Sequence, residues 1–301
     1  MGQFSITTKG ILAIVAAAVL WGVMPIYYGW LRVVPPADIL MHRIFWSLVF
    51  FSVVLAFRGR LGALRKAVTD PSQVGWIALA SFFVSCNWFF FIYSIQVGRL
   101  TESSLGYYMY PLVSVLLGFL IFRERLHRLQ GLAVALMALA VLLLTYGLGV
   151  IPSISLVLAT TFSAYGVVKK RISTGPTVSV TAEVLLLLPL VLLGFVFVAD
   201  TSMLTPGLWA LLILSGPLTG LPLILFSYAS QWVRLSTVGL ISYLNPTLQF
   251  LVAALIFLEP LTPWHALALV LIWIALALYS AVAIRQDRLS AATRSSTSGT
   301  A

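Results

Sequence analysis

One stretch of the chain occurs twice. Residues 100–126 read LTESSLGYYMYPLVSVLLGFLIFRERL, and residues 235–261 read LSTVGLISYLNPTLQFLVAALIFLEPL. The two stretches align without a gap at a shift of 135 residues. The informative matches are Tyr108 with Tyr243, Pro111 with Pro246, and Glu124 with Glu259. The repeat predicts two related halves, which we place at residues 1–148 and 149–285.

The composition identifies the solvent of this protein. Of its 301 residues 61% are hydrophobic and 9% charged, and the mean hydropathy is +1.06. A water-soluble domain carries roughly a quarter charged residues, so lipid must be the main solvent. Apolar runs of about 20 residues, the length that spans a bilayer as a helix, recur along nearly the whole chain. We expect ten spans, at 10–33, 37–57, 73–98, 101–122, 126–147, 150–170, 178–198, 207–232, 236–257 and 263–284.

These runs favour helices over strands. Barrel strands would alternate polar and apolar residues in roughly ten-residue pieces, whereas the runs are apolar all round. The first run continues through Trp21 and Trp30 with no small-residue cleavage site, so we expect a span rather than a removed signal peptide. The lone Cys86 lies inside the third span and reads as a packed thiol. The predicted fold class is an all-α membrane protein with ten transmembrane helices.

The charges predict the topology. One side of the membrane receives Lys9, Arg58, Arg60, Arg65, Lys66, Arg123, Arg125, Arg128, Lys169, Lys170, Arg171, Arg234, Arg285, Arg288 and Arg294. The other side receives Arg32 and Arg99 with the acids Asp38, Glu102, Asp200 and Glu259. The positive-inside rule then places both termini in the cytoplasm. The net charge of +10 is scattered over alternate loops, so it does not indicate a nucleic-acid partner.

Two further expectations concern the tail and the cell. Residues 286–301 are rich in Ser, Thr and Ala without an apolar period, so we expect a disordered cytoplasmic tail. Arg outnumbers Lys and Ala is frequent, which is typical of a bacterium with a GC-rich genome. The expected location is therefore the bacterial cytoplasmic (inner) membrane.

The number of spans in each half has a consequence. Five is odd, so the second half must enter the membrane from the opposite side, and the repeat is predicted to be inverted. Inverted halves that rock about a shared midplane site are a common architecture of secondary transporters.

Spans four and nine carry matching polar stripes. Polar and small residues in a membrane helix turn toward other helices. The small residues of these stripes favour close packing, and for the larger polar ones a cavity lining and a packing role stay equally open. The candidate lining residues here are Tyr107, Tyr108, Ser114, Ser242, Tyr243 and Gln249.

Prolines within the spans are candidate hinges. Each lacks an N–H and so frees a backbone carbonyl inside the membrane. The hinge candidates are Pro111, Pro246, Pro217 and Pro222. The dense run of Gly and Pro at 216–222 predicts that span eight is bent or partly unwound, although a kink that only fits a neighbouring helix would leave the same signal.

Ionisable residues inside spans are functional candidates because burying a charge in hydrocarbon is costly. Arg43 and Glu183 each stand seven residues after a proline, Pro36 and Pro176, at equivalent places of the two halves. We hypothesise that they form a charge gate or bind a zwitterionic or anionic substrate; snorkelling to an interface is the alternative. The remaining deep candidates, for which core packing is the alternative, are His42, Trp46, Asn87, Trp88 and Tyr165.

The sequence resembles a known family. Over residues 9–286 it is similar to the drug/metabolite transporter superfamily, in the RarD-like branch of the EamA-type permeases. The residues that carry the resemblance are His42, Arg43, Trp46, Ser47, Asn87, Trp88, Glu102, Ser104 to Tyr107, Pro111, Leu112, Thr219, Pro222, Leu223 and Leu235 to Thr237. It implies ten spans in two inverted repeats, cytoplasmic termini, and a path between the halves for amino acids, metabolites or drugs, often outward. Relatives often have Asn where this chain has Tyr110, while Asn245 keeps the Asn-Pro pair of span nine and is a further candidate lining residue.

Three classes of function are open to a membrane protein of this kind. A permease or exporter explains the inverted repeat and the inward polar stripes. A lipid-modifying membrane enzyme, or a lipid flippase-like protein, is the alternative, but the histidines His42, His127 and His265 lie far apart without metal-ligand spacing. A structural or assembly factor would need a large exposed surface for a partner, which apolar lipid-facing helices do not reveal in the sequence. We expect no cofactor, no metal and no direct ATP use, while proton coupling through Glu183 or His42, facilitated diffusion and a homodimer stay open.

Overall fold

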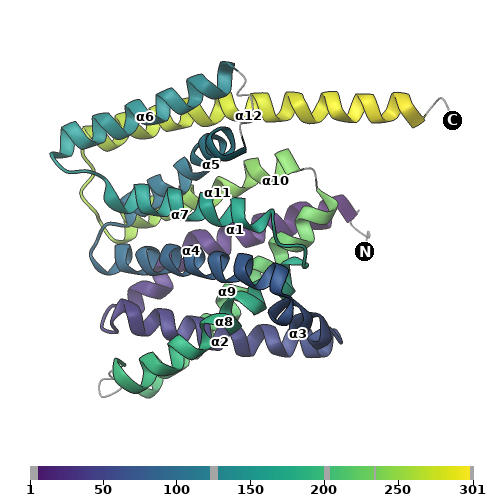
Figure 1. Cartoon of the computed structure of the whole chain (residues 1–301). Coiled ribbons are helices and arrows are strands. Elements are labelled where there is room, and N and C mark those ends of the chain that lie inside the picture. Colours follow the sequence, from purple (N-terminus) through teal and green to yellow (C-terminus); the bar gives the residue numbers. More distant parts are fainter. Residues whose placement is uncertain (1–5, 123–127, 200–203, 234, 299–301) are drawn as a thin grey trace, which may run out of the picture.

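The computed structural model describes residues 6–122, 128–199, 204–233 and 235–298. Every regular element in these residues is a helix (Figure 1). The elements are α1 (Ile6–Trp30), α2 (Pro36–Phe57), α3 (Leu61–Thr69), α4 (Pro71–Gln96), α5 (Leu100–Phe122), α6 (Arg128–Leu148), α7 (Ser153–Lys169), α8 (Pro176–Phe197), α9 (Pro206–Trp232), α10 (Leu235–Ser242), α11 (Leu244–Leu251), the π-helical turn η1 (Val252–Ile256) and α12 (Pro263–Ser298).

The predicted fold class is confirmed. Nine stretches of the described chain are long and apolar enough to cross a membrane, and α7, with 17 residues, is a shorter apolar helix. Together they correspond to the ten predicted spans. Five spans begin on a proline, at the start of the helix where the missing N–H costs nothing: α2, α4, α8, α9 and α12.

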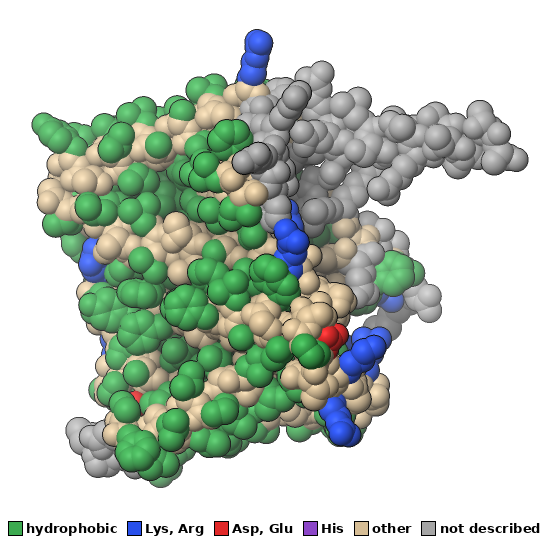
Figure 2. All heavy atoms as spheres, in the orientation of Figure 1, with side chains coloured by type: hydrophobic (Ala, Val, Ile, Leu, Met, Phe, Trp, Pro, Cys, Tyr) green, Lys and Arg blue, Asp and Glu red, His purple; other side chains and the backbone are tan. Residues whose placement is uncertain are grey.

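The surface and the ends fit a membrane setting. Figure 2 shows hydrophobic side chains over much of the visible face, and its Lys and Arg side chains gather mainly at the right-hand end. The start of α1 and the end of α12 lie at this same end in Figure 1. Several residues used in the sequence predictions fall outside the described residues: Arg123, Glu124, Arg125, His127, Asp200 and Arg234.

The packing exchanges the first helix of each half. α7 packs between α4 and α5 of the first half, and α1 packs against α9 and α11 of the second. Swapping the halves maps each of these contacts onto another: α5 with α7 onto α11 with α1, and α4 with α7 onto α9 with α1. The self-matching pairs α2 with α8, α5 with α11, and α6 with α12 are also in contact. The repeat in the sequence is thus a repeat in the packing.

The prediction for span eight is wrong in one respect. α9 continues without interruption through Pro217 and Pro222, so it is not unwound, and α5 likewise continues through Pro111. Membrane helices tolerate proline when neighbouring groups satisfy the freed carbonyls. The break lies instead in span nine, at Tyr243 between α10 and α11, three residues before Pro246.

Two elements differ from the sequence expectations. The short helix α3 buries Leu64 and Ala67 against the base of α8 and leaves Arg65 and Lys66 exposed, whereas we expected a plain loop. α12 continues to Ser298, whereas residues 286–301 were expected to be disordered. Extending an existing helix needs no new nucleus, and Arg, Gln, Leu and Ala in this segment are good helix formers.

Candidate solute cavity

A cavity of about 580 Å³ lies between the two halves. Helices α1, α2, α4 and α5 of the first half and α7 to α11 of the second contribute to its wall. Most of the wall is aromatic or aliphatic. The aromatic lining residues are Trp21, Phe51, Trp88, Phe91, Tyr107, Tyr110, Phe162, Tyr165, Phe226 and Tyr243.

The cavity reaches one end of the bundle. Its lining includes Lys169 at the end of α7, Pro176 at the start of α8 and Ser230 near the end of α9, and the last two are exposed. These helix ends flank the loop with Lys170 and Arg171, so the mouth lies on the cation-rich side.

The opposite end is closed by packed side chains. Tyr28, Leu31, Ile95 and Leu100 are at most 1% exposed and belong to one hydrophobic cluster. Polar contacts reinforce this end: Tyr27 Oη donates to the carbonyl of Leu211 at 2.7 Å. No lining residue of the cavity comes from this cluster beyond Met24 and Phe91.

Glu259 closes the same end through a helix cap. Its carboxylate accepts hydrogen bonds from the backbone N–H groups of Leu100 and Thr101, at 2.6 and 2.7 Å, and from Thr101 Oγ1 at 2.7 Å. These are free N–H groups of the first turn of α5, where a negative charge is favourable. The repeated Glu therefore ties the end of span nine to the start of span four.

Arg43 lines the cavity and is 5% exposed. Its guanidinium carbon lies 4.1 Å from the centroid of the Trp88 ring and 5.7 Å from that of Tyr28. Its Nε and Nη1 atoms have no hydrogen-bond partner in the described part of the chain. Arg43 is thus a buried cation held by aromatic faces.

Glu183 is engaged by a different cation from the one we hypothesised. Lys169 Nζ lies 2.6 Å from its Oε1, Ser179 Oγ donates to the same oxygen at 2.8 Å, and Tyr165 Oη donates to Oε2 at 3.0 Å. Glu183 is 1% exposed and does not line the cavity, whereas Lys169 and Tyr165 do. Arg43 and Glu183 form no ion pair in the described structure.

Asn87 positions the cavity wall. Its amide nitrogen donates to the carbonyl of Leu158 at 3.1 Å and to Thr161 Oγ1 at 3.2 Å, and its oxygen accepts from Tyr107 Oη at 2.8 Å. One side chain of α4 thereby fixes α7 and the Tyr107 ring of α5. The residue lines the cavity, but its described bonds are all to protein.

Five residues around the break in span nine line the cavity. They are Ser242, Tyr243, Asn245, Pro246 and Gln249. Gln249 Nε2 donates to Asn245 Oδ1 at 2.8 Å, and its buried Oε1 has no partner among the described residues.

The structure separates the predicted pathway residues into two groups. Nine of them line the cavity: Arg43, Asn87, Trp88, Tyr107, Tyr165, Ser242, Tyr243, Asn245 and Gln249. The other five do not line the cavity: His42, Trp46, Tyr108, Ser114 and Glu183. The hinge candidates Pro111, Pro217 and Pro222 also lie outside its lining. Tyr108 instead shares a 2.6 Å hydrogen bond with Thr247 and packs near α6 and α12.

Sequence reasoning missed Lys169, Phe162 and Tyr110 as lining residues. Tyr110 could have been found, because the repeat aligns it with Asn245, which also lines the cavity. The sequence marks Lys169 only as a topology residue, because nothing in its local sequence distinguishes it from Lys170.

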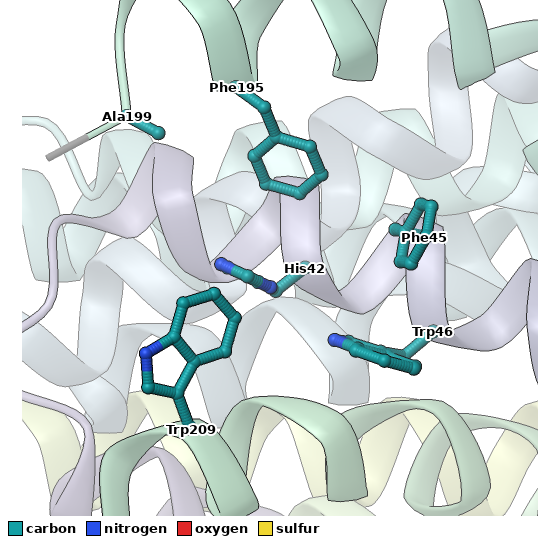
Figure 3. Close-up of a pocket in the computed structure, with 6 residues that line it drawn as sticks. All are labelled: His42, Phe45, Trp46, Phe195, Ala199 and Trp209. Carbon is teal, nitrogen blue, oxygen red and sulfur yellow. The ribbon is translucent and has the colours of Figure 1, made fainter. Parts of the chain in front are cut away.

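A second, smaller pocket holds His42 and Trp46. Its volume is about 250 Å³, and Figure 3 shows the His42 ring between Phe195 and Trp209. The centroid of the His42 ring lies 4.9 Å from that of Phe195 and 5.2 Å from that of Trp209. Nδ1 of His42 and Nε1 of Trp46 have no hydrogen-bond partner among the described groups. The described residues contain no cluster of three His, Cys, Asp or Glu that could hold a metal.

Comparison with known proteins identifies the family. The profile of the EamA-like transporter family matches residues 8–146 and, a second time, residues 151–281. The uncharacterized transporter YojE of Bacillus subtilis is 36% identical over 294 residues, which cover 96% of this chain and 99% of that protein. Protein RarD of Escherichia coli is 34% identical over 287 residues, covering 94% and 97%. A Pseudomonas aeruginosa relative, named chloramphenicol-sensitive protein RarD, is 31% identical over 281 residues, covering 91% and 94%.

A solved structure supports the fold. One crystal structure of a protein matches with a TM-score of 0.61 at 20% sequence identity and covers 93% of this chain and 99% of its own. At that identity the likeness concerns the fold alone. The family match, the relatives and the apolar helices agree that this is a multi-pass integral membrane protein. The chain belongs to the EamA-like transporter family and is a RarD-like transporter.

Proposed function

We propose that this chain is a secondary transporter of small organic solutes in the bacterial cytoplasmic membrane, and that it works by alternating access. The observation that carries the proposal is the cavity, which both halves line and which reaches only one end of the bundle. A solute site between two repeats is where such transporters bind their cargo. The size of the cavity also suits a small molecule.

The symmetric packing supplies a second state. If the halves are inverted, exchanging their conformations would open the end closed by Tyr28 and Leu31 and close the end with Pro176 and Ser230. The break at Tyr243 and the π-turn η1 give span nine two places where its backbone can adjust. The positive-inside rule assigns the open mouth to the cytoplasm, so this conformation is inward-open, with both termini cytoplasmic.

Flux measurements test this function. Purified protein in liposomes is supplied with radiolabelled amino acids, aromatic carboxylates and chloramphenicol, the last because one relative is named for sensitivity to it. Uptake is measured with and without a pH gradient, which separates proton coupling from facilitated diffusion. We expect saturable uptake of at least one solute.

A matched pair of variants links any flux to the cavity. Ser242→Trp places an indole in the cavity, whereas Leu240→Trp places one on the exposed side of the same helix. We expect Ser242→Trp to abolish uptake and Leu240→Trp to preserve it. Equal uptake by both variants would show that the solute takes another path, and absence of uptake by folded wild-type protein would refute the function.

A further inference from the structure

The charge of the cavity wall is unbalanced. The charged side chains among its described lining residues are Arg43 and Lys169. Lys169 is neutralised by Glu183, whose second oxygen is occupied by Tyr165. Arg43 has no carboxylate within ion-pair distance in the described structure. The wall therefore carries one uncompensated positive charge.

The surroundings of Arg43 leave two of its donor nitrogens unused. Trp88 covers one face of the guanidinium at 4.1 Å, which holds the group in place without consuming an N–H. Nε and Nη1 are buried and have no hydrogen-bond partner in the described chain. A buried charge with unmade hydrogen bonds is costly, and a ligand oxyanion that accepts hydrogen bonds from the guanidinium lowers that cost.

The position of Arg43 leaves room for the rest of a ligand. Phe51, eight residues later on α2, also lines the cavity, so Arg43 lies toward the closed end and the remaining volume extends toward the mouth. That volume is walled by the rings of Phe162, Tyr165 and Phe226. These faces suit an aromatic or aliphatic body.

We propose that the cavity selects organic monoanions with an apolar or aromatic body, whose carboxylate binds Arg43. The inference rests on the proposed transport function and names its substrate class. Zwitterions fit less well, because Glu183 is taken by Lys169 and the described lining offers no free carboxylate to an ammonium group. Organic cations are repelled by Arg43.

A series of four probes on one scaffold tests the selection. Binding of 3-phenylpropionate, 3-phenylpropionamide, 3-phenylpropylamine and phenylalanine to the full chain in nanodiscs is measured by calorimetry. We expect the carboxylate to bind at least tenfold more tightly than the amide, phenylalanine to bind more weakly than the carboxylate, and the amine to show no binding. Equal affinity for carboxylate and amide, or tighter binding of the amine, would overturn the inference.

Variants at two arginines locate the selection. Arg43→Gln is expected to bring the carboxylate-to-amide affinity ratio close to one, while Arg43→Lys retains part of it. Arg32→Gln is the matched control, because the Arg32 guanidinium also lies over a ring, Phe257 at 4.4 Å, but is outside the cavity lining. A ratio that survives Arg43→Gln in folded protein would contradict the assignment.

A third variant keeps the idea testable if Arg43 variants do not fold. Glu183→Gln leaves Lys169 as a second free cation at the cavity wall. We expect it to bind the dianion 2-phenylsuccinate several-fold more tightly than wild-type protein does; unchanged affinity would overturn the charge argument. Uptake of only neutral or cationic solutes by wild-type liposomes would refute the substrate class and leave the transport function standing.

Discussion

At the scale of single residues, the ion pair of Lys169 and Glu183 is the clearest determinant of stability. Glu183 is 1% exposed and accepts bonds from three side chains. Removing one partner of a buried pair leaves an uncompensated charge and costs about 3–5 kcal/mol, while removing both costs much less. We expect Lys169→Met to lower the unfolding temperature strongly and the double variant Lys169→Met with Glu183→Gln to recover most of it. Thermal unfolding of the wild type, the single variants Lys169→Met and Glu183→Gln, and the double variant checks this. Additive losses of stability in the double variant would contradict it.

Glu259 gives a second residue-scale prediction. Glu259→Ala removes three hydrogen bonds from the first turn of α5, so we expect a loss of about 1–2 kcal/mol in unfolding free energy. Thr101→Val removes only the hydroxyl bond and should cost less than half as much. Denaturant titration in detergent measures both. A larger effect for Thr101→Val would show that the cap is not the stabilising contact.

The residue scale also shows what the sequence could not predict about the site. The matching positions of Arg43 and Glu183 in the two halves predicted a functional role for both. In the structure Arg43 packs on the Trp88 ring and Glu183 pairs with Lys169. The sequence could not predict their partners, because these depend on which side chains lie close in space, as Lys169 does to Glu183. Likewise the repeat aligns Ser114 with Gln249, but only the longer Gln side chain reaches the cavity.

At the scale of elements, the contact of α5 with α7 depends on Gly106. A Cβ added there would lie 2.8 Å from the carbonyl oxygen of Ser155, so the two helices would have to separate. We expect Gly106→Ala to lower stability and the yield of monodisperse protein.

Gly131 of α6 is the matched control for this prediction. An added Cβ there meets nothing within 4 Å, so Gly131→Ala should be neutral or stabilising by up to about 1 kcal/mol, from helix propensity alone. Thermal unfolding and size-exclusion profiles compare the two variants. Equal behaviour would contradict the close-packing role of Gly106.

Element positions followed from the sequence because apolar length is a strong signal. The predicted ranges match the observed helices within a few residues, except at the end of α12, which continues to Ser298. The positions at which helices are interrupted did not follow from the sequence. Prolines alone do not decide whether a membrane helix opens, since Pro217 and Pro222 sit in an intact α9. The short α3 escaped because it has only nine residues, of which only Leu64 and Ala67 are buried.

At the scale of the whole molecule, access to the two ends of the cavity distinguishes the states. Cys86 is the single cysteine of the chain, so Cys86→Ser gives a cysteine-free background. In that background Ser230→Cys, at the mouth, should react with a membrane-impermeant maleimide from the cytoplasmic side, and Leu31→Cys, 0% exposed, should not. Labelling in inverted vesicles checks this. Rapid labelling of Leu31→Cys from the outside, with Ser230→Cys protected, would show that the resting state is outward-open.

The exchange of first helices has a consequence for biosynthesis. α7 emerges from the ribosome after its partners α4 and α5, whereas α1 ends at Trp30 and its partner α9 begins only at Pro206. At about 5–20 residues per second, α1 waits roughly 10–35 s in the membrane with its packing face uncovered. Lipid or an insertion factor must cover that face until α9 and α11 arrive. The fold is symmetric in space, but the order of synthesis makes its assembly one-directional, with the oldest helix among the last to find its neighbours.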